Sequence, residues 1–193
     1  MPYELDNRLV IGVASSAVFD LSESDAVFRR EGEEQYREYQ EKNLEVPLPK
    51  GIAFPFIKRL LALNDLSPSP EDPLVEVVLL SRNDPDTGLR VMKTIEHYGL
   101  GITRAIFMQG RSPYEYIPAL NIALFLSGHK PDVEAAIGSG HPAGQVLDSM
   151  FDDEEDDQTL RIAFDFDGVL AGDESESVMQ ASGLTAFHDH EVK

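Results

Sequence analysis

Short apolar runs that alternate with amphipathic helical patterns constrain the fold of this 193-residue chain more than any other feature. The runs have the length of buried strands, and the segments between them carry apolar residues at helical spacing. Strands that alternate with helices build a mostly parallel sheet with helices on both faces, so we expect a doubly wound α/β fold. The expected strands are residues 9–14, 75–80, 102–107, 122–126, 143–147 and 160–164.

Several of the expected helices have recognisable ends. One helical pattern starts at Ser22, a good N-cap residue, and continues as a mostly polar stretch over residues 22–43. A second helix is expected over about residues 54–64. Asp84 or Asp86 can cap a third, and Gly99 stands where a C-terminal left-handed residue belongs.

Ligands of such sheets bind beyond the carboxyl ends of the strands. Ser81 follows the run VEVVLL directly, which is the right place for a hydroxyl that binds phosphate. The alternative is that Ser81 caps a helix or closes a turn within SRNDPD.

Composition excludes several function classes. Acidic residues outnumber basic ones 35 to 16, and the net charge of −19 disfavours nucleic acid and anionic membrane surfaces as partners, since both need a positive footprint. The absence of cysteine excludes a disulfide scaffold and thiolate chemistry. No run approaches the roughly 20 apolar residues of a transmembrane helix, and the first residues carry no apolar signal core. We expect a soluble, acidic protein of the cytoplasm.

An acidic run and a weak internal repeat divide the chain. Residues 148–157 hold seven acids, which indicates a solvated linker. Sliding the sequence by 151 positions superimposes the start of the chain on the segment after this run. We therefore predict a degenerate α/β domain over residues 1–147, a linker over 148–159, and the first strand and helix of a second copy over 160–193. The matched pairs are Ile11 with Ile162, Val18 with Val169, Glu23 with Glu174, Asp25 with Glu176, Phe28 with Met179, Gly32 with Gly183, and Tyr36 with Phe187.

A single strand and helix cannot bury both faces of a sheet. The second copy must therefore join the first copy, pair with another chain, or belong to a truncated product. Pairing with another chain makes a homo-oligomer possible.

The strongest chemical signal is FDFDGVL at residues 164–170. Asp165 and Asp167 follow an apolar run two residues apart, so both can face the region beyond a strand end. Such a pair binds a hard divalent cation, and it can divide the work of attacking phosphorus and handling a proton. Gly168 permits a sharp turn that exposes N–H groups to phosphate. The alternative is a pair of solvated carboxylates at a strand end.

This motif resembles motif one of the haloacid dehalogenase (HAD) superfamily of phosphatases. Its wider context, LRIAFDFDGVLAGDESE, resembles more narrowly the cytosolic 5′-nucleotidase family, type I. The segments SSAVFDL, GIAFPFIKRLLALN, VEVVLLSRNDPDTGLRV and GRSPYEYI extend the resemblance over essentially the whole chain.

The resemblance implies a HAD-like fold and hydrolysis of nucleoside 5′-monophosphates. It implies that Asp165 is the nucleophile that forms an aspartyl-phosphate and that Asp167 is the general acid/base. It also implies Mg²⁺, held by the Asp165 carboxylate and the Asp167 backbone carbonyl. We count Phe166 and Gly168, together with Ser81, as candidate substrate-binding residues.

The sequence also departs from the family pattern. The family's later motifs supply a Ser/Thr, a Lys and an Asp-Asp pair, and none of these follows Asp167. The first copy has residues 14–16 (Ala-Ser-Ser) at its own motif-one position, 112–113 (Ser-Pro) in place of the Lys, and 127–128 (Ser-Gly) in place of the Asp pair. It therefore reads as a non-catalytic HAD-like unit.

Three hypotheses follow. The chain is a Mg²⁺-dependent 5′-nucleotidase. Alternatively, it is a truncated, inactive family member that acts as a nucleotide-binding or dimerisation module. The third possibility is a HAD phosphatase for another small phosphate ester, because Phe166 and Gly168 differ from the family's usual small-residue pattern.

Overall fold

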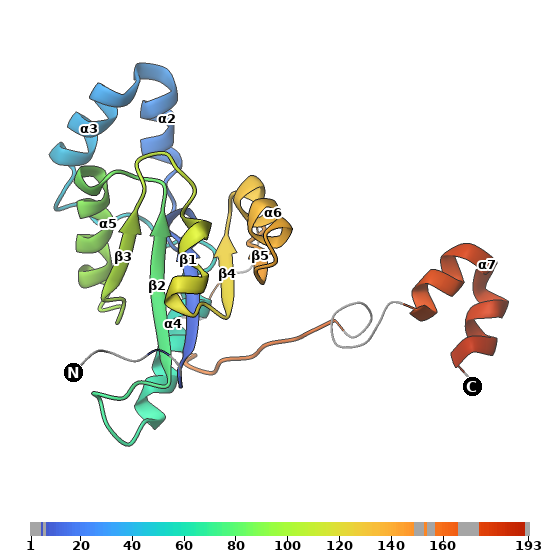
Figure 1. Ribbon diagram of the computed structural model, residues 1–193. Coiled ribbons are helices and arrows are strands. Elements are labelled where there is room, and N and C mark those ends of the chain that lie inside the picture. The colour runs from blue at the N-terminus through green and yellow to red at the C-terminus, as the bar shows by residue number, and fades with distance from the viewer. Residues whose placement is uncertain (1–4, 6, 149–152, 154–156, 166–173, 192–193) are drawn as a thin grey trace. The chain divides into compact units, whose positions relative to one another are not determined.

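Residues 75–81 form β2 (Val75–Ser81), the longest strand among the described residues, and all seven of its residues are buried. A parallel strand that is covered on both faces is almost continuously apolar, which accounts for the run VEVVLL. The computed structural model describes residues 5, 7–148, 153, 157–165 and 174–191 (Figure 1). By its internal contacts the chain divides into two units, Met1–Gln158 and Thr159–Lys193.

The first unit is built on a five-stranded sheet in which every neighbouring pair of strands is parallel. The strand order is β3-β2-β1-β4-β5. The second and third strands of the chain therefore lie on one side of β1, and the fourth and fifth lie on the other. The topological switch point of the sheet therefore lies between the neighbouring strands β1 and β4. The α/β fold with a parallel sheet that we expected is confirmed. The remaining strands are β1 (Leu9–Ala14), β3 (Arg104–Phe107), β4 (Leu124–Ser127) and β5 (Ala143–Gln145).

The helices of the first unit connect these strands, and Figure 1 shows α2 and α3 on the side of the sheet to which the strand arrows point. The third expected helix is capped by Asp84 rather than Asp86, because the Asp84 side chain accepts a hydrogen bond of 2.8 Å from the Thr87 N–H. Gly99 has a φ of 62°, as its place after this helix predicted. The helices are α1 (Ser15–Val18), α2 (Ser22–Glu31), α3 (Glu33–Lys42), α4 (Phe54–Ala62), η1 (Leu63–Leu66), α5 (Pro85–His97), η2 (Pro113–Tyr116), η3 (Pro118–Leu120) and α6 (Lys130–Gly138).

Both faces of the sheet are covered, which makes the fold doubly wound. On one face, Val78 and Leu80 of β2 pack in a cluster with Phe125 of β4 and with residues of η3 and α6. Side chains of successive strand residues point to opposite faces. On the other face, α5 approaches so closely at Gly88 that an added Cβ would meet the ring of Phe107. The core therefore lies in two layers, one on each side of the sheet.

The acidic run is partly attached to the first unit where the structure describes it. The Arg59 guanidinium on α4 lies 2.6 Å from an Asp153 carboxylate oxygen and donates to the Asp157 carbonyl at 2.8 Å. The Arg59 side chain is only 14% exposed. These two described residues of the predicted linker are therefore held against α4 rather than fully solvated. The boundaries that we predicted for the three segments remain predictions.

The second unit contains α7 (Glu174–Glu191), which is interrupted at Gly183 by non-helical backbone angles. The strand expected over residues 160–164 is wrong, because these residues are neither strand nor helix. Ile162 and Phe164 are 51% and 63% exposed. A strand needs a neighbour that supplies hydrogen-bonding partners, and no described strand pairs with this segment.

Candidate functional site

Serine residues stand at the carboxyl ends of the two central strands. The hydroxyls of Ser15, directly after β1, and Ser81, the last residue of β2, lie 2.9 Å apart and are buried. The Ser81 oxygen also accepts a hydrogen bond of 3.1 Å from the Asn83 N–H. Ser81 is therefore at a strand end, as expected, and its hydroxyl has two partners within the protein. Its role in substrate binding remains a prediction.

A third serine closes the turn after β4. The Ser127 hydroxyl is fully buried and accepts a hydrogen bond of 3.0 Å from the His129 N–H. This is a short-range turn contact of the kind that serine side chains commonly form. Ser127 stands at the position that corresponds to the family's Asp pair. Its side chain stabilises the backbone of this turn.

Asp132, in the first turn of α6, joins three loops at this edge of the sheet. Its carboxylate accepts hydrogen bonds from Arg82 Nε at 2.9 Å and from the Ser112 hydroxyl at 2.8 Å. His129 Nδ1 lies 3.1 Å from the same carboxylate. Asp132 is only 4% exposed. The cluster ties the segments after β2 and β3 to the start of α6.

The charge state of Asp132 follows from these contacts. Burial raises the pKa of the Asp132 carboxyl, but the hydrogen bonds from Arg82 and Ser112 and the charges of Arg82 and His129 outweigh it, so that the pKa is lowered. Asp132 was not among the site residues predicted from the sequence. An acid in a first helical turn is a common feature, and the contacts that single it out come from distant parts of the chain.

A large hollow at this edge lies beside the switch point. A cavity of about 700 Å³ is bordered by the segment after β1, the turn after β4 and the segment after β5. Its lining includes residues 16–17, 19–22, 50–52, 128–129 and 145–148, together with Asp25 and Arg29 of α2. Binding sites for small molecules have volumes of about 300–1,000 Å³, so this cavity is large enough for one.

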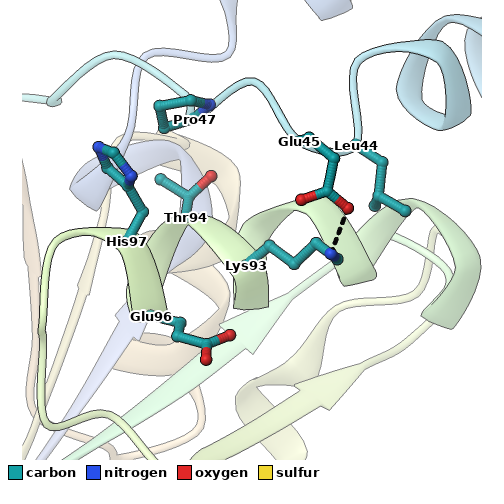
Figure 2. Close-up of a pocket in the computed structure, with 7 residues that line it drawn as sticks. All are labelled: Leu44, Glu45, Pro47, Lys93, Thr94, Glu96 and His97. Carbon is teal, nitrogen blue, oxygen red and sulfur yellow. Dashed lines mark hydrogen bonds and ion pairs between the residues drawn. The ribbon is translucent and has the colours of Figure 1, made fainter.

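A second pocket, drawn in Figure 2, lies between the loop at residues 44–47 and the C-terminal half of α5. Its volume is about 180 Å³. Lys93 and Glu45 form an ion pair across it, as the dashed line shows. The pocket is below the usual size of a small-molecule site, and polar groups already paired to each other border it. We therefore assign it no function.

The predicted catalytic motif falls only partly on described residues. Asp165 lies in the second unit and is exposed. Phe166, Asp167 and Gly168 lie outside the described residues. Ser81 belongs to the first unit, so the two described candidates lie in different units.

Among the described residues, no group of three or more His, Asp or Glu side chains is arranged to hold a metal ion. The Mg²⁺ site that we expect at Asp165 and Asp167 includes a residue beyond this part of the chain. In the same part of the chain, no helix is both long and apolar enough to cross a membrane.

Comparisons with known proteins agree with the resemblance seen in the sequence. The chain matches the 5′-nucleotidase family over residues 1–193. It is 34% identical over 195 aligned residues to human cytosolic 5′-nucleotidase 1B, an alignment that covers 99% of this chain and 32% of the relative. The chain thus spans about a third of the length of this relative. With a family match over its whole length and a doubly wound parallel sheet, the chain belongs to the 5′-nucleotidase family.

Proposed function

We propose that this chain belongs to an enzyme that hydrolyses nucleoside 5′-monophosphates to nucleoside and phosphate, with residues 164–170 as its catalytic motif. The observation that carries the proposal is the family match, which extends through this motif to residue 193. The similar human protein is named as a cytosolic 5′-nucleotidase, which favours the same reaction and a cytoplasmic location.

Two carboxylates suffice for the bond changes of this reaction. The Asp165 carboxylate attacks phosphorus, the bond from phosphorus to the 5′ oxygen breaks, and Asp167 gives its proton to the departing oxygen. Water then attacks the phosphorus of the aspartyl-phosphate and passes a proton to Asp167, and the bond from phosphorus to the Asp165 oxygen breaks. The products are a nucleoside and inorganic phosphate, and both aspartates return to their starting states. The exposure of Asp165 supports this role, because a nucleophile must be reached by its substrate.

Mg²⁺ is the proposed cofactor, held by the Asp165 carboxylate and the Asp167 backbone carbonyl. These oxygen donors are of the type that Mg²⁺ prefers, and a site built from one or two protein groups is typical of Mg²⁺ sites that rely on substrate phosphate. The metal would neutralise phosphate charge that otherwise repels the carboxylate nucleophile. Phe166, Gly168 and Ser81 are the proposed substrate-binding residues.

A phosphatase assay on AMP and IMP with Mg²⁺ tests the proposal. We expect the Asp165→Asn variant to lose activity by on the order of a thousandfold or more, as removal of a nucleophile usually does. Asp65→Asn, which changes an exposed carboxylate on η1, is the matched control and should keep full activity. Equal release of phosphate by the unmodified chain and by Asp165→Asn would contradict the proposal.

That contradictory outcome would favour the second candidate, a family member without turnover that binds nucleotide or pairs with another copy. The buried serines at the carboxyl edge of the first unit favour this candidate for that unit, because hydroxyls stand where the resemblance implies carboxylates. Binding of AMP without turnover, measured by calorimetry, and a dimer in light scattering would support it.

A further inference from the structure

None of the residues that line the cavity of about 700 Å³ beside the switch point has a role in the proposed reaction. It lies where open α/β sheets bind ligands, outside the carboxyl ends of strands that lead away in opposite directions. All of its lining residues belong to the first unit, while the proposed catalytic carboxylates follow residue 164. The cavity is therefore a candidate for a binding site that belongs to the first unit.

Part of the cavity lining is apolar. Ile52 and Leu147 line the cavity and are 42% and 66% exposed, while Phe19 and Leu21, which also line it, are buried. Exposed apolar side chains that border a hollow favour a ligand with a flat apolar face, since binding removes their surface from water.

A carboxylate faces the same hollow. Asp25 lines the cavity and is exposed, and within the described residues no side chain or backbone N–H donates a hydrogen bond to its carboxylate. The neighbouring Arg29 instead donates to the Asp25 backbone carbonyl, at 3.4 Å. Asp20 differs, because its carboxylate accepts from the Ser22 N–H at 2.8 Å. Partial burial is the largest influence on the pKa of Asp25 and raises it, and the charge of Asp20 acts in the same direction, while the charge of Arg29 opposes both. Its oxygens are thus available to a ligand that carries hydroxyl or amino donors.

The charges around the cavity disfavour an anionic ligand. Its lining holds three carboxylates, Asp20, Asp25 and Asp148, against the two cations Arg29 and Lys50. The Lys50 ammonium lies over the ring of Phe54, 5.3 Å from its centre. The local field is therefore mildly negative and disfavours a phosphate monoester, which carries close to two negative charges.

We propose that this cavity binds a nucleoside and discriminates against the corresponding 5′-monophosphate. The exposed apolar side chains of Ile52 and Leu147 are the proposed contacts of the base, and the ribose hydroxyls are the proposed donors to the Asp25 carboxylate. The choice of ligand rests on the proposed function, because the nucleoside is the product of that reaction. A site of this kind lets the first unit sense product while the second unit carries the catalytic motif.

Calorimetric titration of the full chain with adenosine and with AMP tests the proposal. The titrations are done in the Asp165→Asn background, so that AMP is not consumed and a failure of the catalytic proposal does not affect the result. We expect adenosine to bind with a Kd below about 1 mM and AMP to bind at least tenfold more weakly. Asp25→Asn should weaken adenosine binding by about tenfold or more, the usual effect of losing a hydrogen bond to a charged group.

Two further variants complete the test. Leu147→Asp should also weaken adenosine binding, and since Leu147 is 66% exposed, this variant remains informative even if Asp25→Asn fails to fold. Asp65→Asn, outside the cavity lining, should bind adenosine as the background does. No detectable binding of adenosine at a concentration of 1 mM would overturn the proposal. A Kd of 1 mM corresponds to a binding free energy of about −4 kcal/mol. So would unchanged affinity in Leu147→Asp, or AMP binding that matches adenosine and is weakened equally by Asp25→Asn.

Discussion

Gly32 and Gly183, which are 151 positions apart, adopt the same rare backbone conformation. Their φ and ψ angles are 92° and −173° for Gly32, and 81° and 177° for Gly183. Only glycine occupies this region readily. Gly32 separates α2 from α3, and Gly183 interrupts α7. These are the two glycines that the internal repeat aligns, and the repeat itself remains a prediction.

Replacement of Gly32 by alanine should destabilise the protein. A Cβ is poorly tolerated at a φ of 92° with an extended ψ, and the strain of such a residue is on the order of 1–3 kcal/mol. We expect a loss of this size in the free energy of unfolding, measured by urea titration.

Gly138→Ala is the matched control for Gly32→Ala. Gly138 ends α6, and a Cβ added there would meet no atom within 4 Å. Its replacement should be neutral or stabilise the protein by up to about 1 kcal/mol, because alanine restricts the unfolded chain. Equal losses in the two variants would contradict the conformational explanation.

The Ser15–Ser81 contact predicts unequal effects of two alanine substitutions. Ser81→Ala removes the acceptor for the Asn83 N–H as well as the partner of Ser15, whereas Ser15→Ala leaves the Asn83 contact intact. We expect Ser81→Ala to cost about 1–2 kcal/mol of unfolding free energy and Ser15→Ala less. A Ser81→Ala variant of unchanged stability but raised KM for AMP would show instead that Ser81 acts mainly on substrate.

The Asp132 cluster predicts a loss of stability in acid. The folded-state pKa of Asp132 is lowered from 3.8, so its contribution is complete above that value and is lost as the pH falls through the lower, folded value. Asp132→Asn should therefore cost roughly 1–3 kcal/mol near pH 7, and the difference from the unmodified chain should shrink below about pH 4. Thermal unfolding followed between pH 7 and pH 3 measures this.

Glu134→Gln is the control for Asp132→Asn. Glu134 lies on the same helix, is exposed, and pairs with Lys130 at 3.4 Å. An exposed pair contributes at most about 1 kcal/mol, so the control should follow the unmodified chain at each pH. A difference between Asp132→Asn and the unmodified chain that persists undiminished at pH 3 would refute the explanation.

The contacts of Arg59 predict that one substitution frees Asp153 and Asp157. Arg59→Gln removes the charge that faces Asp153 and weakens the bond to the Asp157 carbonyl. We expect cleavage after Asp153 and Asp157 by a protease specific for acidic residues to become several-fold faster, since proteolysis follows the population of the open segment. Lys58→Gln, at an exposed neighbouring position, should leave the rate unchanged. Equal rates for Arg59→Gln and the unmodified chain would mean that the contacts do not restrain the segment.

The wrong prediction of a strand over residues 160–164 has a physical reason that the apolar pattern of the sequence does not contain. The run LRIAF has the composition of a buried strand, and the five confirmed strands were found by the same criterion. Strand formation also needs hydrogen-bonding partners on a neighbouring chain segment, which composition does not report. The exposure of Ile162 and Phe164 is the consequence of that missing partner among the described residues.

The sequence by itself determined the parallel α/β class, the five strands of the sheet and the left-handed residue at Gly99, and it narrowed the cap of α5 to Asp84 or Asp86. These features depend on apolar periodicity and on contacts within a few residues, such as the bond from Thr87 to Asp84. The tertiary structure alone decided that Ser15 meets Ser81, that Asp132 holds Arg82, and that Arg59 holds Asp153. These pairs are separated by 66, 50 and 94 positions, and only the folded sheet brings such distant residues within hydrogen-bond distance.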